Sequence, residues 1–208
     1  MKIVANSIYK RFYRNWIIKD FNYTFNQGQV YGIAGSNGSG KSTLLQILSG
    51  MMGPSKGQIH YSIDGKELEE ENWFSKISYA APYADVYDYM NVKELIQHQQ
   101  HFKKFRNNIT SIDFIETCYL SGHEDKLIKY YSSGMKQRLK LGLAILADSS
   151  VLFLDEPISN LDDRAKLWCK QLLQNHCKDR LVIIASNEPE DFELVNYKIQ
   201  LEVNMNTK

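Results

Sequence analysis

The stretch of sequence that decides the fold is Gly35-Ser36-Asn37-Gly38-Ser39-Gly40-Lys41-Ser42. It fits the pattern G-x-x-x-x-G-K-[ST], in which small residues let the backbone N–H groups close around phosphate oxygens. In this pattern Lys41 reaches the β- and γ-phosphates, and the hydroxyl of Ser42 is placed for Mg²⁺. An apolar, strand-like run over residues 30–34 precedes the loop, and a helical pattern over residues 42–48 follows it. The positive end of that helix is therefore expected to face the phosphates of a nucleotide.

Length, charge and cysteine content bound the class of protein. A chain of 208 residues fits one domain, with room for two lobes and a sizeable core. The 25 basic and 24 acidic residues nearly cancel, so the composition gives no sign of a nucleic-acid patch or a polybasic membrane anchor. Cys118, Cys169 and Cys177 lack the spacing of zinc or redox motifs, which predicts reduced, mostly buried thiols in a cytosolic protein.

No stretch of the sequence predicts a membrane-spanning or secretory segment. The longest apolar runs, such as residues 141–147, are far too short to cross a bilayer as a helix. Residues 1–6 are too few and too polar for a signal peptide. A role at the membrane is therefore expected to come through a partner.

Hydrophobic periodicity predicts an α/β core that a helical lobe interrupts at about residues 83–147. Continuous apolar runs at 151–154 and 181–185 suit a parallel sheet that is covered on both faces. Asn91 with Glu94 predicts a capped helix start, and Asp162 is expected to cap another helix. Further strands are expected at residues 3–5, 21–25, 58–63 and 77–80, and helices at about residues 111–119, 134–147 and 163–175.

Two carboxylates, Asp155 and Glu156, follow the apolar run at residues 151–154. Phosphoryl transfer needs metal coordination and a placed water in addition to a phosphate cradle. Asp155 is expected to complete the Mg²⁺ site, and Glu156 to orient or deprotonate the attacking water. Together with the phosphate-binding loop, the pair favours this interpretation over a solvated acidic turn.

A third element is the run Ser132-Ser133-Gly134-Met135, which precedes an apolar-periodic helix. Hydroxyl side chains at a helix start cap its free N–H groups and can also make an anion site. Taken alone, ordinary capping is the better interpretation of this run.

These three elements, in this order, resemble the nucleotide-binding subunit of an ABC transporter, and residues 131–139 look most like bacterial exporter-type systems. The resemblance implies a P-loop NTPase core of the ABC ATPase type over residues 1–208, with the helical subdomain at about residues 83–147 and an N-terminal antiparallel β region. It implies ATP and Mg²⁺ as cofactors. It also implies ATP-driven, head-to-tail pairing with an identical or a different ABC ATPase subunit. A separate transmembrane permease would hold the chain on the cytoplasmic face of the cell membrane, and no nucleic-acid partner is expected.

The resemblance also assigns roles to single residues. The residues expected to bind ATP are Phe12, Gly35, Ser36, Asn37, Gly38, Ser39, Gly40, Lys41, Ser42 and Thr43. Phe12 stands where the family has an aromatic ring that stacks on adenine, and Tyr13 is the alternative. Ser42 and Asp155 are the implied metal ligands, and Glu156 is the implied base.

Two further segments are implied to act between subunits. The signature segment, which contacts the ATP of the paired subunit, consists of Ser132, Ser133, Gly134 and Met135, where the family commonly has Ser-Gly-Gly-Gln. Residues 159–162 match the loop whose aspartate, here Asp162, helps to join the two sites.

Two positions depart from the family pattern. Pro82 stands where the family usually has a glutamine that binds Mg²⁺ or the water, and proline has no side-chain oxygen. Asn187 stands where the family has a histidine that touches the γ-phosphate. Asn187 can still donate a hydrogen bond as a weak catalytic group, but it cannot relay a proton. Slow turnover is therefore expected.

Three functions remain open at this point. The first is an ATPase subunit that powers a separate permease. The second is a degenerate ATP-binding module with weak hydrolysis, for which Pro82 and Asn187 are the evidence. The third is a non-transport ABC ATPase, against which the single cassette and the lack of long heptad insertions argue. A GTPase is disfavoured because the sequence has no Asn-Lys-x-Asp motif.

Overall fold

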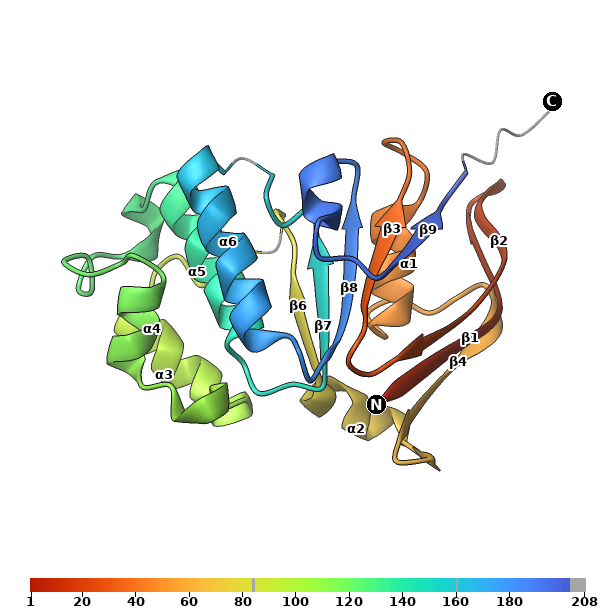
Figure 1. Cartoon of the computed structure of the whole chain (residues 1–208), viewed down its shortest axis with the longest axis horizontal. Coiled ribbons are helices and arrows are strands. Elements are labelled where there is room, and N and C mark those ends of the chain that lie inside the picture. Colours follow the sequence, from red (N-terminus) through yellow and green to blue (C-terminus); the bar gives the residue numbers. More distant parts are fainter. Residues whose placement is uncertain (84, 160, 203–208) are drawn as a thin grey trace.

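The computed structural model describes residues 1–83, 85–159 and 161–202. Two sheets form the framework, one parallel and one antiparallel. A helical lobe and the antiparallel sheet lie on opposite sides of the parallel sheet (Figure 1). The parallel sheet has the order β6-β7-β8-β3-β9, and the antiparallel sheet has the order β2-β1-β4-β5.

The parallel sheet consists of β3 (Val30–Ala34), β6 (Ile77–Ala80), β7 (Val151–Asp155), β8 (Leu181–Ser186) and β9 (Tyr197–Gln200). All residues of β7 and β8 are buried. Leu152 and Leu154 pack into the core on the helical-lobe side, whereas Val151 and Phe153 pack into the core on the other side. This alternation confirms the prediction that residues 151–154 lie in a parallel sheet covered on both faces.

The antiparallel sheet consists of β1 (Lys2–Phe12), β2 (Asn15–Asn26), β4 (Lys56–Ile63) and the short β5 (Lys66–Glu67). The tight turn between β1 and β2 contains Tyr13 in the left-handed region, with a φ of 54°. Apolar residues of β1 and α1 (Lys41–Leu48) share one buried cluster with the parallel sheet, so α1 lies between the two sheets. The phosphate-binding loop is thereby held between two layers.

The helical lobe contains α3 (Val92–Phe102), α4 (Ser111–Thr117) and α5 (Ser133–Ile145), and α6 (Asp163–His176) packs against α5 (Figure 1). The predicted capping box at the start of α3 is present, because Asn91 Oδ1 accepts from the N–H of Glu94 at 3.0 Å and Glu94 Oε2 accepts from the N–H of Asn91 at 2.9 Å. Helix α2 (Glu70–Lys76) and strand β9 are elements that the sequence did not predict.

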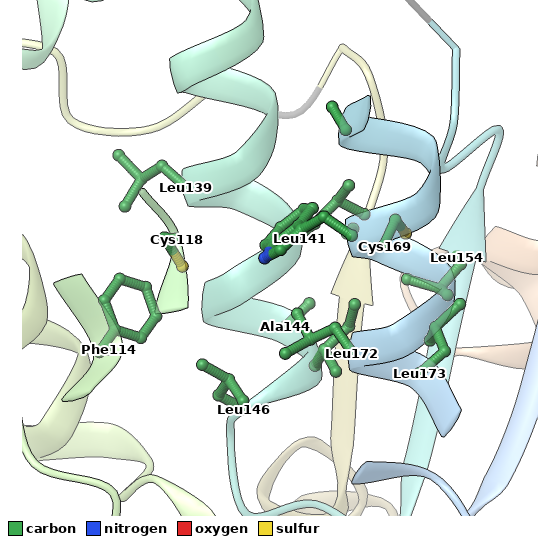
Figure 2. Close-up of a cluster of buried hydrophobic side chains, with 14 of the residues drawn as sticks. Phe114, Cys118, Leu139, Leu141, Ala144, Leu146, Leu154, Cys169, Leu172 and Leu173 are labelled. Carbon is green, nitrogen blue, oxygen red and sulfur yellow. The ribbon is translucent and has the colours of Figure 1, made fainter. Parts of the chain in front are cut away.

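Buried side chains of α4, α5 and α6 form one core (Figure 2). A Cβ atom added to Gly142 of α5 would lie 2.3 Å from Cys118 Sγ and 3.2 Å from a ring carbon of Phe114. The three cysteines are free and buried, as predicted. Burial raises the pKa of the Cys169 thiol to about 12 and that of Cys177 to about 11, so both thiols are protonated and unreactive at neutral pH.

Two short 3-10 helices, Arg106–Asn108 and Ile128–Tyr130, complete the helical lobe, and a third, Pro189–Phe192, follows β8. Arg180, which precedes β8, is almost fully buried and donates from Nη1 to the carbonyl of Ile145 at 2.6 Å. This contact fixes the end of α5 against the start of β8. Among the described residues, no helix combines the length and apolar character that crossing a bilayer requires.

Candidate nucleotide site

The loop between β3 and α1 has the backbone conformation that a phosphate cradle needs. Gly38 and Gly40 adopt φ values of 82° and 98°, which side chains disfavour. A Cβ on Gly40 would also lie 2.7 Å from Cγ2 of Ile17, so β2 leaves room only for glycine there. No described side chain caps the start of α1, and its first N–H groups are therefore left for a ligand.

Lys41 lies inside this loop. Its ammonium group donates to the carbonyl oxygens of Gly35 at 2.9 Å and Ser36 at 3.2 Å, and the residue is only 5% exposed. The buried hydroxyl of Ser39 has no hydrogen-bond partner among the described residues. A buried cation beside an unsatisfied hydroxyl is an arrangement that phosphate oxygens would complete.

Asp155 ends β7 next to the start of α1. Burial raises the pKa of its carboxyl group, while a hydrogen bond from Ser42 and the charge of Lys41 oppose that rise. Its Oδ1 atom is buried and has no partner among the described residues. Hard oxygen ligands of this kind, one carboxylate and one hydroxyl beside a phosphate site, fit Mg²⁺, which usually keeps several waters.

Glu156 follows in a strained conformation, with a φ of 45°. Its N–H donates to the carbonyl of Ala185 at 2.8 Å, which ties this turn to β8. Non-glycine residues in the left-handed region are uncommon and concentrate at functional sites. The turn leaves Glu156 half-buried on the wall of the cleft that the phosphate-binding loop also lines.

These elements border one cleft with a volume of about 410 Å³. The residues that line it are Phe12, Ile17, Asn37, Gly38, Gly40, Lys41, Ser42, Thr43, Pro82, Tyr83, Asp155 and Glu156. The cleft therefore brings together Phe12, most of the loop, and the acidic pair. Phe12 is 43% exposed, so it is not a core aromatic, whereas Tyr13 is 99% exposed and does not line the cleft. The sequence did not single out Ile17 or Tyr83 as site residues.

Asn187 follows β8 and contacts the phosphate-binding loop directly. Its Nδ2 donates to Oδ1 of Asn37 at 3.2 Å. Strands β3 and β8 are neighbours in the parallel sheet, so the segments that follow them lie side by side. This hydrogen bond connects the two segments.

The signature segment lies away from the cleft. Ser132 caps α5 by accepting from the N–H of Met135 at 3.2 Å, and Ser132 and Ser133 are exposed. None of the four signature residues is among those that line the cleft. Farther along α5, Gln137 donates to the carbonyl of Pro157 at 3.1 Å, which connects the signature helix to the residue after Glu156.

Asp162 caps α6, as predicted, by accepting from the N–H of Ala165 at 2.8 Å. It belongs to the segment 159–162, of which Asn160 lies outside the described residues. The carboxylate of Asp162 thus bonds to the start of its own helix, α6.

Comparison with known proteins bears on the family of the chain. The family model described as ABC transporter matches residues 18–159. An uncharacterized ABC transporter ATP-binding protein of Bacillus subtilis, YybJ, is 32% identical over 188 residues, which cover 88% of this chain and 84% of that protein. The ATP-binding cassette sub-family A member 17 of Mus musculus is 31% identical over 208 residues, but the match covers only 12% of that longer protein.

Solved structures share the fold. A putative ABC transporter ATP-binding protein from Pyrococcus furiosus superposes with a TM-score of 0.79 at 22% identity, covering 97% of this chain and 98% of that one. The dimeric ATP-binding cassette MJ0796, bound to ADP and Pi, superposes with a TM-score of 0.81 at 19% identity, covering 96% and 94%. With a family model that matches most of its length and a relative of similar size, the chain belongs to the ABC transporter family, in which it is an ATP-binding ATPase domain.

Proposed function

We propose that this chain is an ATP-hydrolysing subunit that powers a separate transmembrane permease, and that it acts as an ATP-bound dimer. The observation that carries the proposal is the single cleft in which Lys41, the Ser42–Asp155 pair and Glu156 meet. These groups supply what phosphoryl transfer to water requires: a phosphate cradle, metal ligands and a base.

Each of these residues has a separate role in ATP hydrolysis. Lys41 and the N–H groups of the loop bind the β- and γ-phosphates, and Phe12 stacks on the adenine. Ser42 and Asp155 hold Mg²⁺, which when bound neutralises charge on the phosphates. Glu156 orients the attacking water and accepts its proton.

Dimerisation follows from the position of the signature segment. Ser132 and Ser133 are exposed and lie outside the cleft of their own chain. We infer that they, with Gly134 and Met135, close the cleft of a second subunit, and that Asp162 contributes to the same interface. The second subunit is a copy of this chain or a different ABC ATPase.

The permease is inferred from membership of the ABC transporter family. A subunit of this kind is held at the cytoplasmic face of the membrane by its permease. Because Pro82 lacks a side-chain oxygen and Asn187 cannot relay a proton, we expect slow hydrolysis by the isolated chain. A module that binds ATP with only residual hydrolysis is the alternative that these two residues favour.

The test combines hydrolysis with assembly. Wild type should release phosphate from Mg-ATP, and Glu156→Gln, which keeps the shape but removes the base, should lose most of that activity. The same variant should form dimers in saturating Mg-ATP when measured by size-exclusion chromatography with light scattering. Glu71→Gln, the same change at an exposed glutamate that does not line the cleft, serves as the control. A Glu156→Gln protein that keeps wild-type hydrolysis contradicts the assigned base, and one that stays monomeric contradicts dimerisation by this chain alone.

A further inference from the structure

The wall of the cleft that residues 82–83 form includes a proline. Pro82 offers neither a side-chain donor nor a backbone N–H to a nucleotide. The next residue, Tyr83, lines the same cleft as Glu156 and Lys41. Building on the ATPase function proposed above, we propose that the hydroxyl of Tyr83 contacts the γ-phosphate of bound ATP and replaces the missing polar group at Pro82.

The exposure and the hydrogen bonding of the Tyr83 side chain support this role. Tyr83 is 91% exposed at the mouth of the cleft, and its hydroxyl makes no hydrogen bond with the residues that the structure describes. The side chain can therefore close over a nucleotide without breaking a native contact. A phenol hydroxyl can both donate and accept a hydrogen bond, so it can pair with a phosphate oxygen.

Several other polar groups of the cleft already have partners. Lys41 is bonded to two loop carbonyls, and Asn37 accepts from Asn187. Ser42 is hydrogen-bonded to Asp155. Tyr83 thus differs from these groups, because its hydroxyl is available to a ligand at no internal cost.

A second contact ties this wall to the signature helix. The ammonium group of Lys140, on α5, donates to the carbonyl oxygen of Pro82 at 2.7 Å. Burial lowers the pKa of Lys140, and the nearby charge of Asp85 opposes that shift. We infer that Lys140 is a positioning residue, because this bond holds the backbone beside Tyr83 against α5.

The first experiment isolates the hydroxyl. Tyr83→Phe removes only the oxygen, and Tyr89→Phe is the matched control, because Tyr89 is an exposed tyrosine of the same segment that does not line the cleft. In steady-state phosphate release, Tyr83→Phe should lower kcat about tenfold or more, as expected for a donor to transition-state charge. KM should rise by about threefold at most. Unchanged kcat in Tyr83→Phe would overturn the proposal.

A binding measurement separates this inference from the proposed ATPase function. By calorimetry, Tyr83→Phe should weaken ATP binding roughly threefold and leave ADP binding unchanged, because the contact is to the γ-phosphate. This readout holds even if wild type hydrolyses no ATP, a result that would count against the proposed ATPase function alone. Equal effects on ATP and ADP, or none on either, would overturn the Tyr83 contact.

The positioning role of Lys140 has its own test. Lys140→Met should lower kcat, and Lys140→Arg, which keeps a cation, should restore most of the loss. In the Tyr83→Phe background, Lys140→Met should lower kcat little further, because both changes act through one contact. A full additional loss of kcat in the double variant would contradict a positioning role that acts through Pro82. A failure of Lys140→Arg to restore kcat would contradict it as well.

Discussion

Asn187 and Asn37 are joined by a hydrogen bond of 3.2 Å between Nδ2 of the first and Oδ1 of the second. The bond places the residue after β8 against the phosphate-binding loop. A position that the sequence marked as a departure from the family is thus beside the loop that we propose binds the phosphates. We infer that Asn187 contacts the nucleotide from here, but as an amide it transfers no proton.

The nature of the group at residue 187 should set the rate of hydrolysis. Asn187→His introduces a side chain that can carry a charge beside the γ-phosphate, and should raise kcat several-fold. Asn187→Ala removes the donor and should lower kcat by about tenfold or more. Steady-state phosphate release measures both variants. Equal rates in wild type and both variants would show that Asn187 does not reach the reacting centre.

Stacking on adenine should depend on the ring at position 12. Phe12→Ala should weaken ATP binding by roughly tenfold, whereas Phe12→Tyr should bind nearly as wild type, because stacking needs a π face. Tyr13→Ala should bind as wild type, since Tyr13 lies outside the cleft. Calorimetry with Mg-ATP measures all three variants. A loss in Tyr13→Ala and none in Phe12→Ala would reverse the assignment.

Packing against Gly142 should make alanine unfavourable there, although alanine is the better helix former. We expect Gly142→Ala to lower the free energy of unfolding by about 1–3 kcal/mol, because its Cβ would overlap Cys118 Sγ. In a Cys118→Ala background the same change should cost less. Gly53→Ala is the control, since nothing lies within 4 Å of its added Cβ. Urea unfolding of the four variants measures this; an equal cost in both backgrounds would contradict the overlap.

Asp191 should make stability fall as pH rises. Burial raises its pKa in the folded protein to about 7, against the ordinary value of 3.8, with Glu188 and Glu156 adding to the rise. Bonds from Ser186, at 2.5 Å, and from the backbone of Ile158 oppose it. Because the folded state holds this proton more tightly than the unfolded state, the stabilisation is present below about pH 4. It is lost progressively as the pH approaches 7.

Asp191→Asn removes this titration. The free energy of unfolding of wild type should therefore drop relative to that of Asp191→Asn between pH 5 and pH 8, by on the order of 1 kcal/mol per pH unit below 7. Urea unfolding at pH 5, 6, 7 and 8 measures the difference. A difference between the two proteins that does not change with pH would show that Asp191 does not titrate in this window.

Local patterns predicted much of the fold, because the features involved are local in the chain. The strand at residues 77–80 has the predicted bounds, and the caps at Asn91 and Asp162 are present, since each depends on a few adjacent residues. Contacts between distant segments were not predictable in this way. Sequence spacing cannot show that Arg180 would be buried against the end of α5, or that Ile17 would press on Gly40.

The sequence likewise predicted one part of the candidate site and missed another. The loop and the acidic pair carry strong local signals, and the structure joins them in one cleft. Tyr83 carries no such signal, because its relevance depends on the proline before it and on the fold that brings it to the same cleft as Glu156. Helix α2 and strand β9 were missed because they are short and mostly polar or exposed, so neither shows a clear apolar period.

Calorimetry of Lys41→Ala with Mg-ATP tests the claim that this loop binds the phosphates of ATP through Lys41. Loss of a charge-assisted contact should weaken binding at least tenfold. Lys126→Ala, which removes an exposed lysine, should bind as wild type. Circular dichroism should show that both variants remain folded. A folded Lys41→Ala protein with wild-type affinity for ATP would contradict the claim.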